Sequence, residues 1–286
     1  MIKLQLNHVS YIYSKGTPFQ KTALDDVTIG FEAGKITGLI GHTGSGKSSL
    51  VNLLNGLYRP TTGEVLLDGQ NIWNNPREIN KIRARVGLVM QYPEYQLFDE
   101  TVRADIGFGP RNLGLDSKEI DRRVNEAVSF VGIDESLLTK SPFELSGGQQ
   151  RRVAIAGILA MEPEVLVLDE PAAGLDPRGR KEIMNGLVRY AREKGVTVIL
   201  VSHSMEDMAT YCDNVVVMYQ SRIYKSGTVE EIFRDATSLT EVLLNVPQVS
   251  QIMTKLKNSG IKLEGNLYTV SRALDAIIAY LSKVVE

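Results

Sequence analysis

The stretch KITGLIGHTGSGKSS, residues 35 to 49, decides the fold. It begins with a short apolar run of the kind found in buried strands, and a glycine-rich turn then leads into an expected helix that starts near Gly46. The pattern Gly-x-x-x-x-Gly-Lys-Ser is met by Gly41, Gly46, Lys47 and Ser48. Because this pattern lies between a strand and a helix, it predicts a phosphate-binding loop.

Each part of this loop has an expected role in holding a nucleotide triphosphate. The backbone N–H groups wrap the phosphates, Lys47 reaches the β- and γ-phosphates, and the Ser48 hydroxyl is a ligand for Mg²⁺. The remaining loop residues expected to bind nucleotide are His42, Thr43, Gly44, Ser45 and Ser49.

A pair of carboxylates follows a second apolar strand. The sequence EVLVLDEP, residues 164 to 171, ends in Asp169 and Glu170. Beside a phosphate loop, Asp169 is expected to hold Mg²⁺, usually through water, and Glu170 to polarise an attacking water molecule. His203, which follows the strand VTVILVS, is expected to contact the γ-phosphate.

The rest of the chain predicts an α/β fold with a mostly parallel sheet. Apolar strands alternate with amphipathic helices expected at 118–131 and 178–194, the second ending at Gly195. The character changes after Gly227. Residues 229–286 predict a small appended α+β domain, with two or three helices and one extended piece, NLYTVS, at 266–271.

Composition favours a globular protein of the cytosol. The chain has 286 residues, 43% hydrophobic and 23% charged, and its formal net charge of −2 gives no reason to expect nucleic acid as a partner. One cysteine, Cys212, fits a reducing compartment. The sequence shows no signal peptide and no apolar run of the ~20 residues that a membrane helix needs, so any membrane role is expected to come through a partner.

A second anion-binding pattern lies about a hundred residues after the first. FELSGGQQRR, residues 143 to 152, places a serine and two glycines ahead of a helix expected from Arg151 to Met161. Glycines let the backbone approach a ligand closely, and a helix N-terminus attracts anions. One chain therefore carries two expected phosphate cradles.

These motifs, in this order, resemble those of the ATP-binding subunits of ABC transporters over roughly residues 1–228. GHTGSGKSS matches Walker A, VLVLDE matches Walker B and LSGGQQRR matches the ABC signature. Four further residues match: Tyr13 in VSYIY, the aromatic residue that stacks on adenine; Gln91 in VMQYP, the Q-loop; Asp176, the end of the D-loop AGLD; and His203, the switch histidine.

The resemblance implies a nucleotide-binding domain over 1–228, with a RecA-like core, an antiparallel β subdomain and a helical subdomain at about 92–160. It also implies that two such domains pair head to tail, so that the two cradles serve two ATP molecules. The signature residues Ser146, Gly147, Gly148 and Gln149, together with Asp176, would then act on the partner's ATP. Glu170, His203 and Gln91 are the implied catalytic residues, and Ser48, Gln91 and Asp169 the implied Mg²⁺ ligands.

The stretch YPEYQLFDETVRADIGFGPRNLGL, residues 92 to 115, resembles the second type of A-component of energy-coupling factor (ECF) transporters. That resemblance implies a peripheral protein on the cytoplasmic face of the membrane that powers uptake of a vitamin or metal ion. A helix around Gln96 to Val102 would contact a transmembrane T-component, and a separate S-component would bind the substrate. The domain at 229–286 would serve dimerisation.

Three alternatives stay open at this point. The chain could serve a conventional ABC importer, act as a soluble ABC ATPase on ribosomes or DNA, or bind nucleotide without hydrolysis. The near-neutral charge, the single cassette and the absence of a long coiled coil count against the second, and Glu170 with His203 counts against the third. The sequence names neither the transported substrate nor the choice between homodimer and heterodimer, and it assigns no role to Trp73 and Cys212.

Overall fold

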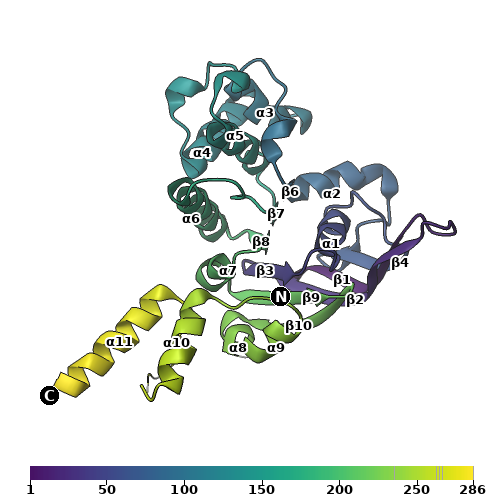
Figure 1. The fold of residues 1–286 in the computed structure, drawn as a ribbon. Coiled ribbons are helices and arrows are strands. Elements are labelled where there is room, and N and C mark those ends of the chain that lie inside the picture. The colour runs from purple at the N-terminus through teal and green to yellow at the C-terminus, as the bar shows by residue number, and fades with distance from the viewer. Residues whose placement is uncertain (235, 262, 264, 266, 286) are drawn as a thin grey trace.

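The computed structural model describes residues 1–234, 236–261, 263, 265 and 267–285. A core of two sheets carries a helical lobe on one side and a pair of projecting C-terminal helices on the other (Figure 1).

The central sheet has six strands in the order β10-β9-β3-β8-β7-β6. Strands β9, β3, β8, β7 and β6 are parallel, and β10 pairs antiparallel to β9 at one edge. The α/β expectation is therefore confirmed. The strands are β3 (Ile36–Gly41), β6 (Val86–Val89), β7 (Val165–Asp169), β8 (Thr197–Val201), β9 (Asn214–Tyr219) and β10 (Arg222–Thr228).

A second, antiparallel sheet has the order β2-β1-β4-β5. Helix α1 (Lys47–Leu54) and this sheet share one apolar core with the central sheet, in which Leu4, Phe31, Leu39 and Leu50 are fully buried. Burying this apolar surface fixes the start of α1, and therefore the phosphate loop, against both sheets. The strands are β1 (Ile2–Tyr13), β2 (Lys21–Glu32), β4 (Thr62–Leu67) and β5 (Gln70–Asn71).

Helices cover the other face of the central sheet and form the lobe at the top of Figure 1. The expected apolar face of the helix at 118–131 is buried from Val124 onward, and Gly195 ends the helix expected at 178–194 with a left-handed φ of 66°. These helices are α3 (Val102–Asn112), α4 (Ser117–Val131), α5 (Gly147–Leu159), α6 (Pro177–Lys194) and α7 (Met205–Tyr211). Helix α2 (Ile79–Arg85) lies instead on the side of α1, where Ile82 packs against the core shared with the antiparallel sheet. The 3-10 turns are Pro76–Glu78, Pro93–Gln96, Glu135–Leu137 and Pro142–Glu144.

Two helix predictions in this lobe were wrong about where the helix begins. The helix expected from Arg151 starts four residues earlier, because Ser146 and Gln149 form a capping box at the start of α5. The helix expected around 96–102 is a loop. There the Asp105 carboxylate accepts hydrogen bonds from the backbone N–H groups of Phe98 and Asp99, and α3 starts only after these residues.

Helices are the regular secondary structure that the described residues form after β10. Helices α8 (Val229–Arg234) and α9 (Ala236–Glu241) pack on the same core as α6 and α7, whereas α10 (Gln248–Asn258) and α11 (Val270–Val285) project away (Figure 1). The extended piece expected at 266–271 is not a strand over 267–271, since α11 begins at Val270 and no strand of the described chain pairs with this segment. Residue 266 lies outside the described residues.

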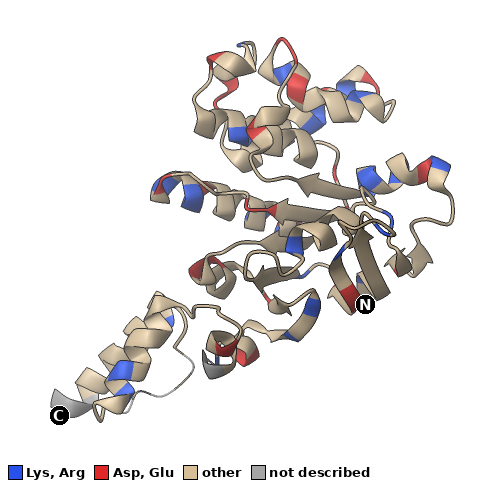
Figure 2. Ribbon diagram, turned by 45° about the vertical axis from the view of Figure 1, so that its right-hand side comes forward, with Lys and Arg blue, Asp and Glu red and all other residues tan. Residues whose placement is uncertain are grey.

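Basic and acidic residues alternate along the helical lobe (Figure 2). Arg122 illustrates this pattern, since it pairs with Glu119, Glu126 and Glu162. Within the described residues, no helix has the length and apolar character needed to cross a membrane.

Candidate nucleotide-binding site

Four of the expected site segments meet at one edge of the central sheet. Strands β3, β8, β7 and β6 are adjacent and parallel, so their carboxyl ends lie side by side. The phosphate loop follows β3, His203 follows β8, Asp169 and Glu170 lie at the end of β7, and Gln91 follows β6. This is the edge at which open parallel sheets bind ligands.

The phosphate loop has a backbone shape that only glycine tolerates at two positions. Gly46 has a φ of 105°, and a Cβ there would lie 2.4 Å from the Ala23 carbonyl oxygen. A Cβ on Gly41 would lie 2.5 Å from both the Met218 carbonyl oxygen and the Ser45 hydroxyl. The loop is therefore packed against β2 and β9 with no room for larger residues, which keeps its backbone pre-formed.

Lys47 lies under this loop. It is 8% exposed, and its Nζ donates hydrogen bonds to the carbonyl oxygens of Gly41 at 2.6 Å and His42 at 3.1 Å. The buried Ser45 hydroxyl has no hydrogen-bond partner, while Ser48 is exposed. A buried cation and an unpaired hydroxyl around a glycine-rich loop suit a phosphate group, which accepts hydrogen bonds from both.

The carboxylates of β7 lie close to the loop and to His203. Glu170 has a left-handed φ of 52°, and its side chain is 15% exposed. The His203 Nε2 lies 3.7 Å from Glu170 Oε1, which has no hydrogen-bond partner. This distance exceeds that of a normal hydrogen bond, so the two groups are neighbours with space for adjustment.

Burial shifts the titration of all four charged groups. It raises the pKa of Asp169 and of Glu170, and it lowers the pKa of Lys47 and of His203. In Lys47 the negative charges of Glu170 and Asp169 partly oppose this effect. Clustered groups whose charged forms are disfavoured by burial are typical of catalytic sites.

Tyr13, expected to stack on a base, is held by an aromatic cluster. Its hydroxyl lies 3.0 Å from that of Ser49 at the start of α1. Its ring makes edge contacts with Tyr11, at 4.9 Å between centroids, and with Tyr58, at 6.0 Å. The end of β1 is therefore tied to the helix that carries Lys47.

The second cradle lies on the helical lobe, at the start of α5 (Figure 1). Ser146 caps the helix, and Ser146 and Gly147 are exposed. A Cβ built on Gly147 would meet nothing within 4 Å, and one on Gly148 would meet only Leu175, at 3.5 Å. The chain itself therefore gives no steric reason for a glycine at 147, as expected if something outside the chain approaches the backbone there.

Asp176 and Gln91 occupy exposed positions at the edges of the two regions. Asp176 caps α6 by accepting a hydrogen bond from the Gly179 N–H at 2.7 Å. Gln91 is exposed two residues after β6. The structure thus gathers the residues of the first cradle at the sheet edge and leaves the signature and Asp176 facing outward.

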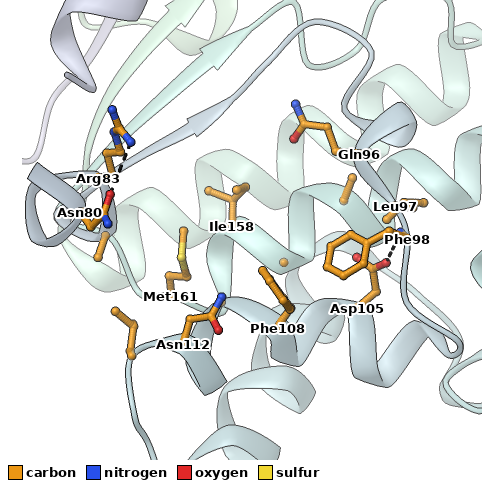
Figure 3. Close-up of a pocket in the computed structure, with 15 residues that line it drawn as sticks. Asn80, Arg83, Gln96, Leu97, Phe98, Asp105, Phe108, Asn112, Ile158 and Met161 are labelled. Carbon is orange, nitrogen blue, oxygen red and sulfur yellow. Dashed lines mark hydrogen bonds between the residues drawn. The ribbon is translucent and has the colours of Figure 1, made fainter. Parts of the chain in front are cut away.

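An apolar groove of about 660 Å³ separates α2 from α3 and α5 (Figure 3). Phe98 and Phe108 lie on its wall with their rings edge to face, 4.7 Å apart, and Ile158 and Met161 line the side formed by α5 and the turn after it. Both phenylalanines are partly exposed, which is unusual for paired aromatic rings unless a partner covers them.

Some contacts around the site were missed in the sequence. Tyr11 could have been found, because residues two apart in a strand share one face, but Tyr58 comes from a distant segment. The ion pair between Arg151 and Glu94 was also missed. In the sequence, only the double arginine after the signature points to an ion pair, and it does not identify the acidic residue that pairs with Arg151.

Known proteins match this chain over nearly all of its length, and a family model matches part of it. The profile of the ABC transporter family matches residues 24–173. The energy-coupling factor transporter ATP-binding protein EcfA2 of Clostridium acetobutylicum is 48% identical over 279 residues, which cover 97% of this chain and 98% of that protein. The protein of the same name from Symbiobacterium thermophilum is 50% identical over 274 residues, covering 96% and 95%.

Solved structures share the fold. That of cbiO1 from Clostridium perfringens, part of the ABC transporter complex cbiONQ, has a TM-score of 0.75 at 40% identity, covering 88% of this chain and 99% of that chain. The dimeric, post-hydrolysis structure of the ATP-binding cassette MJ0796 with ADP and Pi has a TM-score of 0.71 at 27% identity, covering 79% and 98%.

Proposed function

The chain belongs to the ABC transporter family and, within it, to the ATP-binding subunits of energy-coupling factor transporters, and on that premise we propose that it powers the uptake of a vitamin or metal-ion micronutrient. Its enzymatic activity is ATP hydrolysis coupled to transport. The observation that carries the proposal is the meeting of a pre-formed phosphate loop, two partly buried carboxylates and a histidine at one sheet edge.

In the proposed mechanism, each side chain acts where the fold has placed it. Lys47 holds the β- and γ-phosphates, and Tyr13 stacks on the adenine base. Glu170 orients and polarises the attacking water, while the neighbouring His203 contacts the γ-phosphate. The unpaired Glu170 Oε1 supports this role, because it leaves one acceptor free for a water molecule.

Mg²⁺ fits the donors available beside the loop. The Ser48 hydroxyl, the Asp169 carboxylate and the Gln91 amide offer oxygen ligands, which Mg²⁺ prefers. Among the described residues, no group of three or more His, Cys, Asp and Glu side chains could hold a metal alone. A Mg²⁺ ion held by Ser48, Asp169 and Gln91 beside the phosphates would neutralise charge on the phosphate chain.

We propose that Ser146, Gly147, Gly148, Gln149 and Asp176 act on the ATP bound to a second subunit. The exposure of Ser146, Gly147 and Asp176 and the open space beside Gly147 support a partner nucleotide at this surface. A head-to-tail pair would let ATP close the interface and hydrolysis reopen it, because only the triphosphate completes both sets of contacts. The MJ0796 cassette, a structural neighbour, is dimeric.

The apolar groove of Figure 3 is the proposed docking site for a coupling helix of the transmembrane T-component. Its mixed lining, with Phe98 and Phe108 beside Arg83 and Asp105, suits an amphipathic helix with a basic or acidic end. The S-component, which binds the substrate, would then be reached only through the T-component. Closure of the ATPase pair would move two such grooves toward each other.

The projecting helices α10 and α11 are proposed to contribute to dimerisation, as part of a C-terminal domain over 229–286. Val270, Leu274, Ile278 and Leu281 are each more than half exposed, and their spacing places them along one side of α11. An apolar stripe of this length favours a contact with the second ATPase subunit.

Affinity purification from detergent-solubilised membranes tests the proposal. We expect the tagged chain to bring down integral membrane proteins and a second ATPase, as a peripheral subunit on the cytoplasmic face would. Co-purification of a periplasmic-type binding protein system would indicate a conventional importer instead. Recovery of ribosomes without membrane proteins would contradict the transport role.

A further inference from the structure

Arg151 has a buried guanidinium, and each of its three nitrogens donates a hydrogen bond. Its side chain is 4% exposed. Nε donates to Glu94 Oε2 at 3.0 Å and Nη2 to Glu94 Oε1 at 2.6 Å, while Nη1 donates to the Ala173 carbonyl oxygen. The guanidinium also lies over the Tyr92 ring, 5.7 Å from its centroid. One side chain thus joins three segments that are distant in the sequence.

Each of these segments carries a residue of the nucleotide sites. Glu94 lies in the 3-10 turn Pro93–Gln96, which starts two residues after Gln91. Ala173 lies in the loop between Glu170 and Asp176. Arg151 itself is in α5, the helix that Ser146 caps.

The backbone beside Gln91 has an unfavourable conformation. Tyr92 has a left-handed φ of 54°, a conformation that is unfavourable for a bulky residue. Its neighbour Pro93 is buried, and the Tyr92 ring lies beneath the Arg151 guanidinium. Such a conformation persists only where surrounding contacts fix it, and the contacts with Arg151 are of this kind.

Stability alone does not account for an ion pair at this place. A buried pair costs desolvation, and apolar residues of the same volume often stabilise a fold equally well. What the bidentate pair adds is direction, because a planar guanidinium fixes both the distance and the orientation of the carboxylate. Burial would raise the pKa of Glu94, but the hydrogen bonds from Arg151 lower it, so the carboxylate stays ionised and paired.

We infer that Arg151 is a positioning residue that locks the loop after Gln91 and the loop after Glu170 to the signature helix, so that the three segments move as one body. This inference rests on the proposed function, because it joins the chain's own hydrolytic site to the surface offered to the partner's ATP. It predicts that the Arg151–Glu94 pair affects turnover more than nucleotide binding.

The test compares Arg151→Lys and Glu94→Gln with Arg152→Lys and Glu182→Gln. Arg152 is the next residue of α5, and it pairs with Glu182 of α6 and with the Val131 carbonyl oxygen, away from the nucleotide loops. ATP affinity of the single subunit and kcat and KM of the purified complex are measured for all four variants. Thermal unfolding of each reports any loss of fold.

We expect Arg151→Lys and Glu94→Gln to lower kcat by ~10- to 100-fold, the scale of a misplacement of about 1 Å, with ATP affinity within about twofold. The control pair should keep normal turnover. The double variant Glu94→Gln with Arg151→Lys should be no slower than the worse single variant, since both changes break the same link.

Two outcomes would overturn the inference. One is turnover in Arg151→Lys and Glu94→Gln equal to that of the controls. The other is loss of ATP binding in both variants together with lowered unfolding temperatures, which would make the pair a purely structural contact. Absence of ATP binding and hydrolysis in the unmodified complex would instead contradict the proposed function itself.

Discussion

Single residues of the sheet edge combine burial with unmet hydrogen-bonding capacity. Glu170 has a left-handed backbone, a mostly buried side chain and an unpaired Oε1, all of which cost free energy in the chain alone. Under the phosphate loop, Ser45 likewise combines burial with an unpaired hydroxyl. Such costs are understandable if the nucleotide and its water supply the missing partners.

Glu170→Gln is expected to separate binding from hydrolysis. The amide keeps the shape of the side chain but cannot act as a base, so turnover should fall by about 10²-fold or more. ATP affinity should stay near that of the unmodified chain, and Mg·ATP should trap the closed dimer on size-exclusion chromatography. Near-normal turnover would remove Glu170 from the mechanism.

Lys47→Ala should abolish tight ATP binding, because it removes the one buried cation from the loop. Isothermal titration calorimetry of ATP into the single subunit measures the affinity directly. Lys15→Ala is the matched control, since Lys15 is exposed in the turn between β1 and β2. Equal ATP affinity in Lys47→Ala and the control would contradict the assignment of the loop.

Tyr13→Ala should have a milder effect. Stacking on a base is worth about 1–3 kcal/mol. The free energy of ATP binding should therefore become less favourable by about that amount. Tyr13→Phe keeps the ring and loses only the contact with the Ser49 hydroxyl, and should bind ATP nearly as well as the unmodified chain. A fluorescent ATP analogue titrated against the three forms would show whether the ring or the hydroxyl matters.

At the scale of elements, the sequence predicted what local patterns determine. The apolar runs of β3, β7, β8 and β9 and the amphipathic faces of α4 and α6 are visible as periodicity, and the phosphate loop is a local motif. The loop at 96–101 was missed because the carboxylate of Asp105 turns the backbone there, and no periodicity encodes such a bond. Tyr58 and the Arg151–Glu94 pair were missed because their partners lie far away in the sequence.

Elements of the two sheets are also joined by a charged cluster, whose contribution depends on pH. Lys3 of β1 and Arg85 at the end of α2 both pair with Glu164, just before β7, at 2.5 and 2.6 Å. The hydrogen bond from Arg85 is the largest cause that lowers the pKa of Glu164, from 4.5 to about 2. Because the folded pKa lies below the unfolded one, the stabilisation is present above about pH 4.5 and is lost as the pH falls toward 2.

Glu164→Gln should therefore destabilise the fold at neutral pH and much less in acid. Urea unfolding of the variant and the unmodified chain, repeated between about pH 7 and pH 3, measures the difference in free energy of unfolding. The partial exposure of Glu164 keeps the expected effect modest. A difference that stays constant or grows as the pH falls would show that the cluster does not stabilise through the ionised carboxylate.

On the scale of the whole molecule, the two cradles differ in what surrounds them. The phosphate loop lies against both sheets with its glycines packed on backbone, whereas the signature opens outward from the helical lobe. A single chain therefore offers one enclosed half-site and one exposed half-site. Head-to-tail pairing is the simplest arrangement that brings an exposed half to each enclosed one.

Gly147→Asp tests this arrangement. The new side chain meets no atom within 4 Å of its Cβ, and a carboxylate at a helix N-terminus is electrostatically favourable, so the subunit should fold normally. Facing a γ-phosphate, the same carboxylate would repel it and block the close approach of the backbone. We expect the single subunit to bind ATP with unchanged affinity, while dimer closure and hydrolysis fail; Gly147→Ala should be affected less.

In a mixed pair, the ATP site that loses activity shows whether the signature acts on the partner's ATP or shares a site with Lys47. If this chain works with a sister subunit, Gly147→Asp should disable the site built on the sister's phosphate loop and leave the groups of the site built on Lys47 intact. Titration of ATP onto the single subunit, beside ATPase activity of the assembled complex, measures both effects. Should Gly147→Asp abolish ATP binding by the single subunit, the signature and Lys47 would belong to one site, because only a shared site allows a change at the exposed cradle to reach the enclosed one without a partner.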